Sequence, residues 1–178
     1  MNLDNARKIH GWTNELELAW LAEKASRCTN IAEVGSWQGR STRAIADNTT
    51  GRVYACDTFK GTPEDGHYKL LTDKPEDWLY TEFTRNMEGL SNVVTLAMPS
   101  LDAAKLFQGP TFDMIFIDAA HDYDNVKADI LAWRPLLKPG GLFCGHDFDA
   151  GRAGVVTAVR ELIKNPRMAG AGSIWFEG

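Results

Sequence analysis

Polar residues that can bind a divalent cation or accept a proton follow two apolar segments in the second half of the chain. Asp118 follows the apolar residues 112–117, and His146 and Asp147 follow the segment 142–145. Because parallel strands end at the same edge of a sheet, we expect these three side chains to lie close together there. Two carboxylates and an imidazole form a mixed oxygen and nitrogen site that suits Mg²⁺, Mn²⁺ or a similar ion. Asp118, His146 and Asp147 are therefore the predicted metal ligands, although His146 and Asp147 also fit an ordinary turn without an ion.

His121 lies three residues after Asp118 and is the candidate proton acceptor of the same group. The reference pKa of histidine, about 6.5, suits proton abstraction near neutral pH. A neighbouring divalent ion would help by lowering the pKa of a hydroxyl group bound to it. Asp118 and His121 are thus the predicted catalytic residues. The alternative is structural, because His121 and Asp122 also fit the residues that begin a helix.

A second group of residues surrounds a glycine-rich turn in the first third of the chain. It consists of Glu33, Gly35, Ser36, Trp37, Gly39, Ser41 and Asp57. Gly35 and Gly39 let the backbone approach a ligand without a Cβ atom in the way. Asp57 ends the next apolar segment, where a carboxylate can bind the hydroxyl groups of a ribose. Together they predict a nucleoside-cofactor site, although a glycine turn, a capping aspartate or a core tryptophan each occur without one.

Trp37 indicates which cofactor this turn would take. A dinucleotide-binding turn has glycine at this position, where the diphosphate passes the start of the helix. An indole leaves no room for a diphosphate but can pack against an amino-acid tail. Ser41 begins the following helix, where a hydroxyl and the helix dipole favour a carboxylate, and Glu33 is placed to orient an amine or the turn itself. The pattern favours S-adenosylmethionine over a nicotinamide cofactor; a nicotinamide-dependent oxidoreductase and a non-catalytic cofactor-binding domain remain the alternatives.

The elements that must position these residues alternate between strand and helix along the chain. Strands are predicted at 31–34, 52–56, 93–97, 112–117, 142–145 and 173–177, and helices from Asn14 to about 26 and at 41–48, 78–88, 101–107, 126–133 and 155–163. Asn14 and Glu17 form a capping pair for the first helix. The alternation predicts an α/β fold, a single doubly wound Rossmann-like sandwich with a mostly parallel sheet and helices on both faces. Residues 60–78 lack a clear period and are predicted to form a lid-like excursion of a single domain at 1–178.

Composition limits the classes of partner. The chain has 178 residues, 44% of them hydrophobic, and a formal net charge of -5. Without a block of lysine and arginine, nucleic acid is not an expected partner, and no apolar run reaches the roughly 18 residues of a membrane span. The first residues lack the apolar core of a signal peptide, and the cysteines have no metal-type spacing. We therefore expect a cytoplasmic protein that binds neither nucleic acid nor membrane; a homodimer is compatible with the sequence.

Four segments, taken in order, resemble a known family. They are Glu-Val-Gly-Ser-Trp-Gln-Gly-Arg-Ser-Thr from residue 33, Cys-Asp-Thr-Phe from 56, Phe-Ile-Asp-Ala-Ala-His-Asp-Tyr from 116 and Lys-Pro-Gly-Gly-Leu-Phe-Cys-Gly-His-Asp-Phe from 138. Over about residues 31–148 the chain resembles class I S-adenosylmethionine-dependent methyltransferases, and among them the small catechol-type and macrolide-sugar-type O-methyltransferases. The resemblance implies transfer of a methyl group to a hydroxyl of a small molecule or sugar, with assistance from a divalent metal such as Mg²⁺ or Mn²⁺.

The resemblance also assigns roles to individual residues. It places Glu33, Gly35, Trp37 and Ser41 against the methionine part of the cofactor, Asp57 on the ribose, Thr58 and Phe59 beside the adenine and Ser100 in contact with it, with Ser36, Gly39 and Asp118 in the same site. His121 matches the position of the catalytic base. His146 departs from the family pattern, in which an oxygen fills this ligand position. Ser100 also fits the N-cap of the helix that follows it.

Overall fold

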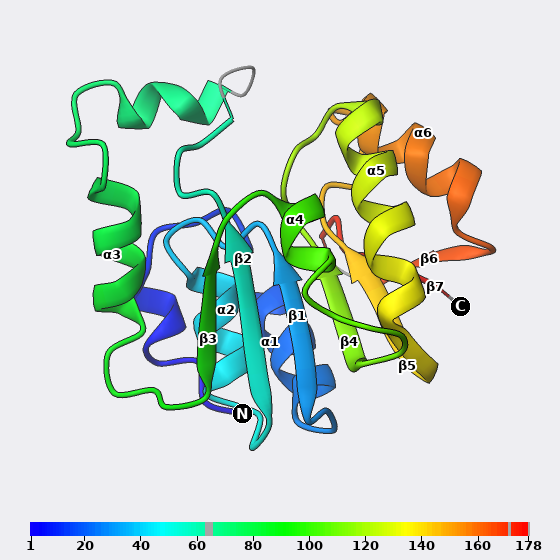
Figure 1. Cartoon of the computed structure of the whole chain (residues 1–178), viewed down its shortest axis with the longest axis horizontal. Coiled ribbons are helices and arrows are strands. Elements are labelled where there is room, and N and C mark those ends of the chain that lie inside the picture. Colours follow the sequence, from blue (N-terminus) through cyan, green and yellow to red (C-terminus); the bar gives the residue numbers. More distant parts are fainter. Residues whose placement is uncertain (63–65, 171, 178) are drawn as a thin grey trace.

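The computed structural model describes residues 1–62, 66–170 and 172–177. In this part of the chain, seven strands form one sheet with the order β3-β2-β1-β4-β5-β7-β6 (Figure 1). Their bounds are Asn30–Val34 (β1), Arg52–Asp57 (β2), Val93–Ala97 (β3), Phe112–Ile117 (β4), Leu137–Gly145 (β5), Pro166–Met168 (β6) and Trp175–Glu177 (β7). The first five strands are parallel, and β7 pairs antiparallel with both β5 and β6. Because β1 lies between β2 and β4, the strand order reverses at β1, and the carboxyl edge of the sheet has its switch point there.

Helices cover both faces of the sheet, as Figure 1 shows. They run over Glu15–Ala25 (α1), Arg40–Ala46 (α2), Trp78–Asn86 (α3), Ser100–Ala104 (α4), Tyr123–Trp133 (α5) and Ala153–Leu162 (α6). Residues of α4, α5 and α6 pack in one hydrophobic cluster with Ile115 and Ile117 of β4, whereas α1 and α2 pack with Met114 and Phe116 of the same strand. Successive residues of β4 thus point to opposite faces and are buried on both, as in a parallel sheet covered by helices. The predicted doubly wound α/β sandwich is confirmed.

Capping residues set the starts of two helices that border the site. The Asn14 side chain accepts hydrogen bonds from the N–H groups of Leu16 and Glu17, and the Glu17 carboxylate accepts one from the Asn14 N–H group. This is the predicted capping box of α1. At α5, the carboxylate of Asp122 accepts a hydrogen bond from the N–H group of Asn125. Asp122 therefore caps α5. The residues before it, 118–121, connect β4 to this helix and line the cavity at the carboxyl edge of the sheet.

Three segments differ from the sequence prediction. Residues 138–141, which precede the strand predicted at 142–145, also belong to β5, and the register of β5 with β4 shifts between the pairs Phe112–Leu137 and Met114–Leu142. The short β6 is not predicted, because three residues beginning with proline carry no strand pattern. In the excursion, residues 63–65 lie outside the described residues, and a 3-10 helix (η2, Gly66–Leu71) precedes α3. The lid-like role of the excursion stays a prediction.

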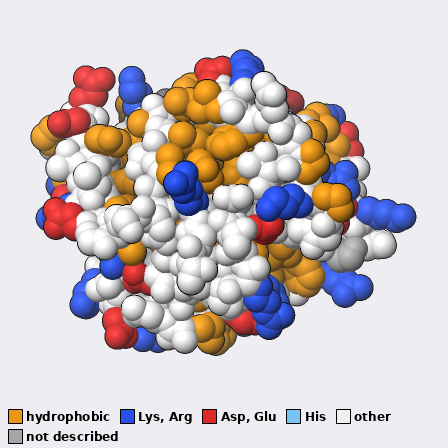
Figure 2. Space-filling view, turned by 60° about the horizontal axis from the view of Figure 1, so that its bottom comes forward, with side chains coloured by type: hydrophobic (Ala, Val, Ile, Leu, Met, Phe, Trp, Pro, Cys, Tyr) orange, Lys and Arg blue, Asp and Glu red, His pale blue; other side chains and the backbone are white. Residues whose placement is uncertain are grey.

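The exposed surface carries apolar as well as charged side chains. On the face shown in Figure 2, hydrophobic side chains gather in the upper middle of the view, and basic and acidic side chains lie around them. Single exposed apolar residues such as Leu106 and Leu131 are usual on protein surfaces and do not identify a partner by themselves. Within the described residues, none of the helices combines the length and the apolar character needed to cross a membrane.

Candidate active site

A cavity of about 970 Å³ opens at the carboxyl edge of the sheet, at the switch point beside β1. Its volume lies at the upper end of the range for small-molecule sites, about 300–1,000 Å³, so a nucleoside and a second reactant can share it. Of the predicted site residues, the cavity is lined by Gly35, Ser36, Trp37, Ser41, Asp57, Thr58, Ser100, Asp118, His121, His146 and Asp147. The structure therefore brings the glycine-rich turn and the metal-type residues into one cavity. Glu33, Gly39 and Phe59 are buried and do not line it.

The carboxylate of Asp57 holds the glycine-rich turn in place. Its Oδ2 atom accepts hydrogen bonds from the backbone N–H groups of Ser36 at 2.9 Å and Trp37 at 2.8 Å, and its Oδ1 atom accepts one from Phe59 at 2.7 Å. Burial raises the pKa of Asp57, and these backbone donors oppose the rise. The N–H groups of the turn are therefore already bound to an anion that belongs to the protein. Since Asp57 also lines the cavity, its remaining acceptor capacity is available to a ligand.

Two glycines allow close contacts that a larger residue would prevent. Gly35 has a φ of +91°, and a Cβ atom there would lie 2.0 Å from the carbonyl oxygen of Asp118. Gly39 has a φ of +88°, and its Cβ atom would lie 2.6 Å from the terminal methyl group of Met87. Gly35 thus brings the end of β1 against the end of β4, which places the turn next to Asp118. Gly39 instead packs the start of α2 against the end of α3, away from the cavity.

Glu33 is completely buried beneath the turn. Its Oε2 atom accepts hydrogen bonds from the hydroxyl groups of Ser36, at 2.9 Å, and Thr42. Its Oε1 atom has no hydrogen-bond partner within the described part of the chain. Burial raises the pKa of Glu33, and the hydroxyl groups of Ser41, Thr42 and Ser36 oppose the rise. Glu33 is thus bonded to Ser36 of the turn, and one of its buried carboxylate oxygens has no donor among the described residues.

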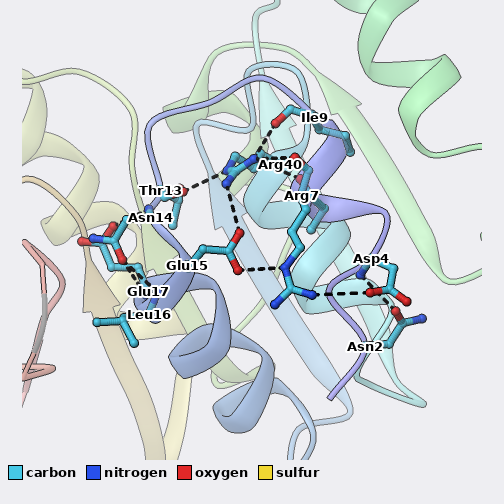
Figure 3. Close-up of polar contacts among 11 residues, drawn as sticks. Asn2, Asp4, Arg7, Ile9, Thr13, Asn14, Glu15, Leu16, Glu17 and Arg40 are labelled. Atoms are coloured by element: carbon cyan, nitrogen blue, oxygen red, sulfur yellow. Dashed lines mark hydrogen bonds and ion pairs between the residues drawn. The ribbon is translucent and has the colours of Figure 1, made fainter.

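Residues 6–14 form a strap that crosses the start of α2 and contributes to the cavity wall. Arg40, the first residue of α2, holds this strap from below (Figure 3). Its guanidinium donates hydrogen bonds to the carbonyl oxygens of Ile9 at 2.8 Å and Thr13 at 2.9 Å, and to two carbonyl oxygens of the 3-10 helix η1, Ala6–Lys8. One side chain therefore positions the strap relative to the glycine-rich turn, because Arg40 follows that turn directly.

Asp118, His121 and Asp147 meet at the ends of β4 and β5. His121 Nε2 lies 2.8 Å from Asp147 Oδ2, and one ligand atom of each of the three residues lies within 4.8 Å of the others. Burial raises the pKa of Asp118 to about 7, with His146 opposing the rise and Asp147 adding to it. Although burial acts in the other direction, the imidazoles of His121 and His146 hold the pKa of Asp147 well below its usual range. Two adjacent carboxylates therefore differ strongly in proton affinity.

His146, the remaining predicted metal ligand, lies among three carboxylates. Its Nδ1 atom lies 3.6 Å from Asp118 Oδ1 and 3.4 Å from Asp147 Oδ2, and its Nε2 atom lies 3.1 Å from Glu17 Oε1. Despite the opposing effect of burial, these three carboxylates raise the pKa of His146 to about 11. Within the described residues, Asp118, His121 and Asp147 form the group whose ligand atoms could hold a cation. A role of His146 as a further ligand stays a prediction.

Another part of the cavity contains Ser100 and a buried acid, Asp129. Ser100 is the first residue of α4, and its hydroxyl group donates a hydrogen bond to Asp129 Oδ1 instead of capping the helix. Thr58 and Ser100 line the cavity, so a role beside an adenine stays a prediction for both. Phe59 is placed differently from that expectation. It is 3% exposed, and its ring packs 4.9 Å from the ring of Phe83 in the core.

Residues 32–148 match the sequence model of a methyltransferase domain family. The matched segment includes the glycine-rich turn, Asp57 and the cluster at the ends of β4 and β5. The chain belongs to this family. The resemblance to class I S-adenosylmethionine-dependent methyltransferases and the Rossmann-like fold expected from the sequence are thereby confirmed.

One curated relative and two solved structures are similar to this methyltransferase domain. The uncharacterized protein y4gI of Sinorhizobium fredii is 24% identical over 170 residues, and the chain spans 18% of the length of that relative, with 88% of its own length matched. A putative caffeoyl-CoA O-methyltransferase from Staphylococcus aureus is 19% identical with a TM-score of 0.68, covering 97% of this chain and 87% of that chain. The S-adenosylhomocysteine-bound Podospora anserina methyltransferase PaMTH1 is 14% identical with a TM-score of 0.67, covering 98% and 84%. At these identities the two structures establish the fold.

Three residues of the methyltransferase cavity escape prediction from the sequence. Glu17 is predicted only as a capping residue, although it also pairs with His146. Asp129 lies next to Ile130 on the buried face of α5, and an acid on an apolar face is a signal that could have identified it. Arg40 carries no such signal, because the carbonyl groups that it binds belong to the backbone and not to a residue type.

Proposed function

We propose that this domain transfers a methyl group from S-adenosylmethionine to a hydroxyl group of a small molecule or sugar. The observation that carries the proposal is the pair of hydrogen bonds from the backbone of Ser36 and Trp37 to Asp57. A dinucleotide would need those N–H groups for its diphosphate, and the Asp57 carboxylate occupies them with a negative charge of its own. A nucleoside without phosphate avoids this conflict. It can also use Asp57 for its ribose hydroxyls.

The cavity offers separate partners for the parts of such a cofactor. Ser41 lies at the start of α2, where the helix dipole favours a carboxylate, and Asp57 accepts hydrogen bonds from the ribose. The S-adenosylhomocysteine-bound fold neighbour and the putative O-methyltransferase support the same cofactor and the same kind of acceptor. The competing proposal of a nicotinamide-dependent oxidoreductase is disfavoured, because two N–H groups of the turn that would bind a diphosphate are bonded to Asp57.

His121 is the proposed base for the acceptor hydroxyl. Methyl transfer forms a bond from the acceptor oxygen to the methyl carbon and breaks the bond from that carbon to sulfur, and the hydroxyl proton leaves to the imidazole. Asp147, 2.8 Å from His121 Nε2, stabilises the imidazolium that results. Holding both reactants in line within one cavity supplies up to about 7–11 kcal/mol of the barrier.

A divalent cation fits the same residues, and we include it in the proposal as an assisting ion. Asp118, His121 and Asp147 would hold Mg²⁺ or Mn²⁺, which lowers the pKa of a bound hydroxyl group. In that state His121 is a ligand and not the base. His146 limits the strength of such a site, because its positive charge already balances Asp118 and Asp147.

Calorimetric titration with the demethylated product, S-adenosylhomocysteine, tests the proposed function. We expect binding to the wild-type protein and its loss in Asp57→Ala, which removes the ribose acceptor and frees the N–H groups of the turn. The exposed Asp73, outside the cavity, provides the control Asp73→Ala, in which binding should persist. A folded wild-type protein that binds NADH but not S-adenosylhomocysteine would contradict the proposal. Product binding without methyl transfer to any hydroxyl in a panel of catechols and sugars would instead support a non-catalytic domain.

A further inference from the structure

We propose that Asp129 determines cofactor specificity by accepting a hydrogen bond from the 6-amino group of the purine. The inference rests on the proposed function, since it concerns the base of the nucleoside that the cavity would bind. It adds a residue that neither the sequence motifs nor the family match assigns. Its consequence is a preference for 6-aminopurine over other purines.

The position of Asp129 in the cavity wall is the first observation. Asp129 is on α5, is 5% exposed and lines the cavity. The hydroxyl group of Ser100 donates a hydrogen bond to its Oδ1 atom. The Oδ2 atom receives no hydrogen bond from the described residues. It is also not completely enclosed by protein atoms. The small accessible part of Asp129 is thus an acceptor at the cavity surface.

The strand order indicates where the purine would lie. The glycine-rich turn follows β1, Asp57 ends β2, and Ser100 follows the neighbouring strand β3. A nucleoside with its amino-acid part at the turn and its ribose on Asp57 extends its base toward the residues after β3. α4 and α5 pack together there, which brings Ser100 and Asp129 to the same place. The base therefore meets a wall that contains one hydroxyl and one carboxylate.

The chemistry of Asp129 selects a donor. A buried carboxylate without a cation is costly unless N–H or O–H groups bind it, and among the described side chains only Ser100 does so. Burial accordingly raises the pKa of Asp129 to about 6. An amino group at purine C6 would supply the missing donor, whereas hydrogen at C6 would leave Oδ2 without one. Sites that bind a ligand N–H group with a buried partner discriminate strongly against ligands that lack it.

The test compares two ligands in two proteins. S-adenosylhomocysteine and its 6-deamino analogue, with hydrogen in place of the amino group, are titrated by calorimetry into the wild-type protein and Asp129→Ala. We expect the wild type to bind S-adenosylhomocysteine about 10- to 100-fold more tightly than the analogue. In Asp129→Ala this ratio should fall to about 3-fold or less, because the acceptor is missing for both ligands. The matched control is Asp124→Ala, an exposed acid on the same helix, which should keep the wild-type ratio.

Each failure has a distinct meaning. Equal affinities of the wild type for the two ligands would overturn the inference without any variant, so the test does not depend on the folding of Asp129→Ala. An unchanged ratio in a folded Asp129→Ala would also overturn it. Both results would leave the proposed function intact, since S-adenosylhomocysteine would still bind. Absence of S-adenosylhomocysteine binding to the wild type would contradict the proposed function and the inference together.

Discussion

Buried carboxylates occur in two regions of the cavity, and their partners differ. In the region that we assign to the nucleoside, Glu33, Asp57 and Asp129 accept hydrogen bonds from hydroxyl and backbone N–H groups. Across residues 1–62, 66–170 and 172–177, no basic side chain forms an ion pair with these three. Burial raises the pKa of each. We call Glu33, Asp57 and Asp129 the nucleoside acids.

The acids at the ends of β4 and β5 have positive partners. His146 lies within 3.6 Å of Asp118, Asp147 and Glu17, and His121 also contacts Asp147. The pKa of Glu17 is lowered, against the effect of burial, by its ion pair with His146 and by backbone donors. We call this set, Glu17, Asp118, His121, His146 and Asp147, the reaction cluster.

The difference indicates what each region is built to receive. The nucleoside acids retain acceptor capacity and have no cationic partner among the described residues, so they are suited to the amine and hydroxyl donors of a ligand. The reaction cluster balances much of its charge internally, so its carboxylates can control the proton of an imidazole without a ligand present. Changes in the first region should therefore affect cofactor affinity, and changes in the second should affect the rate of methyl transfer.

His121→Gln is the sharpest test of this division. It keeps a polar side chain of similar length but cannot accept the proton, so we expect methyl transfer to slow by about 10²- to 10⁴-fold. The affinity for S-adenosylhomocysteine should stay within about 3-fold of the wild type, because the nucleoside acids are untouched. Single-turnover transfer to an accepted catechol or sugar measures the first quantity, and calorimetry the second. Loss of affinity with an unchanged rate would contradict the comparison.

A divalent cation should act on the reaction cluster alone. At an ion concentration about 100 times its dissociation constant, binding would raise the free energy of unfolding by about 2.7 kcal/mol. Thermal unfolding with Mg²⁺ or Mn²⁺, against a chelator, measures this increase. Asp147→Asn should abolish it, whereas Asp149→Asn, which changes an exposed neighbour, should retain it. A wild-type protein whose stability both ions leave unchanged would contradict the assisting ion.

The sequence predicts the fold and the backbone positions of the site better than it predicts contacts between side chains. Alternating apolar segments and the capping pair Asn14 and Glu17 locate most elements within a few residues, because these signals are local. Asp57, Asp118 and Asp147 reach one edge because parallel strands must end there. These predictions depend on the order of strands and helices, which the hydrophobic periodicity of the sequence indicates directly.

The contacts that the sequence does not predict come from distant segments. His146 is held by Glu17, a residue of the first helix, so its charge state depends on packing that no local motif encodes. Phe59 follows Asp57 in the chain, yet α3 draws its ring into the core through Phe83. Asp129 approaches Ser100 because α4 and α5 pack together. Side-chain partners of this kind become visible only with the tertiary structure.

Asp129→Asn should change how the free energy of unfolding depends on pH, because Asp129 has no cationic partner among the described residues. Its pKa of about 6 in the folded protein exceeds the unfolded value of about 3.9. Since the folded state holds the proton more tightly, stability should fall as the pH rises from about 4 to about 6 and stay lower above that range. Asparagine removes this dependence and should raise stability at pH 8 by up to about 3 kcal/mol, while stability at pH 4 changes little. Urea unfolding at the two pH values measures the effect, and an equal change at both would contradict it.

Arg40→Lys should give the smallest effect and extend the comparison to the strap. Lysine keeps the charge, but its single ammonium group cannot replace the planar guanidinium, which donates to the carbonyl oxygens of Ile9 and Thr13 at the same time. The strap over the nucleoside region should therefore loosen. We expect about 10-fold weaker binding of S-adenosylhomocysteine and faster amide hydrogen exchange at residues 9–14. Arg43→Lys is the matched control, because Arg43 lies on the same helix and binds the carbonyl oxygens of Asn86 and Glu88 away from the cavity. If both variants lower the melting temperature but only Arg40→Lys weakens binding, the strap belongs to the cofactor site; equal weakening by both would assign Arg40 to general stability.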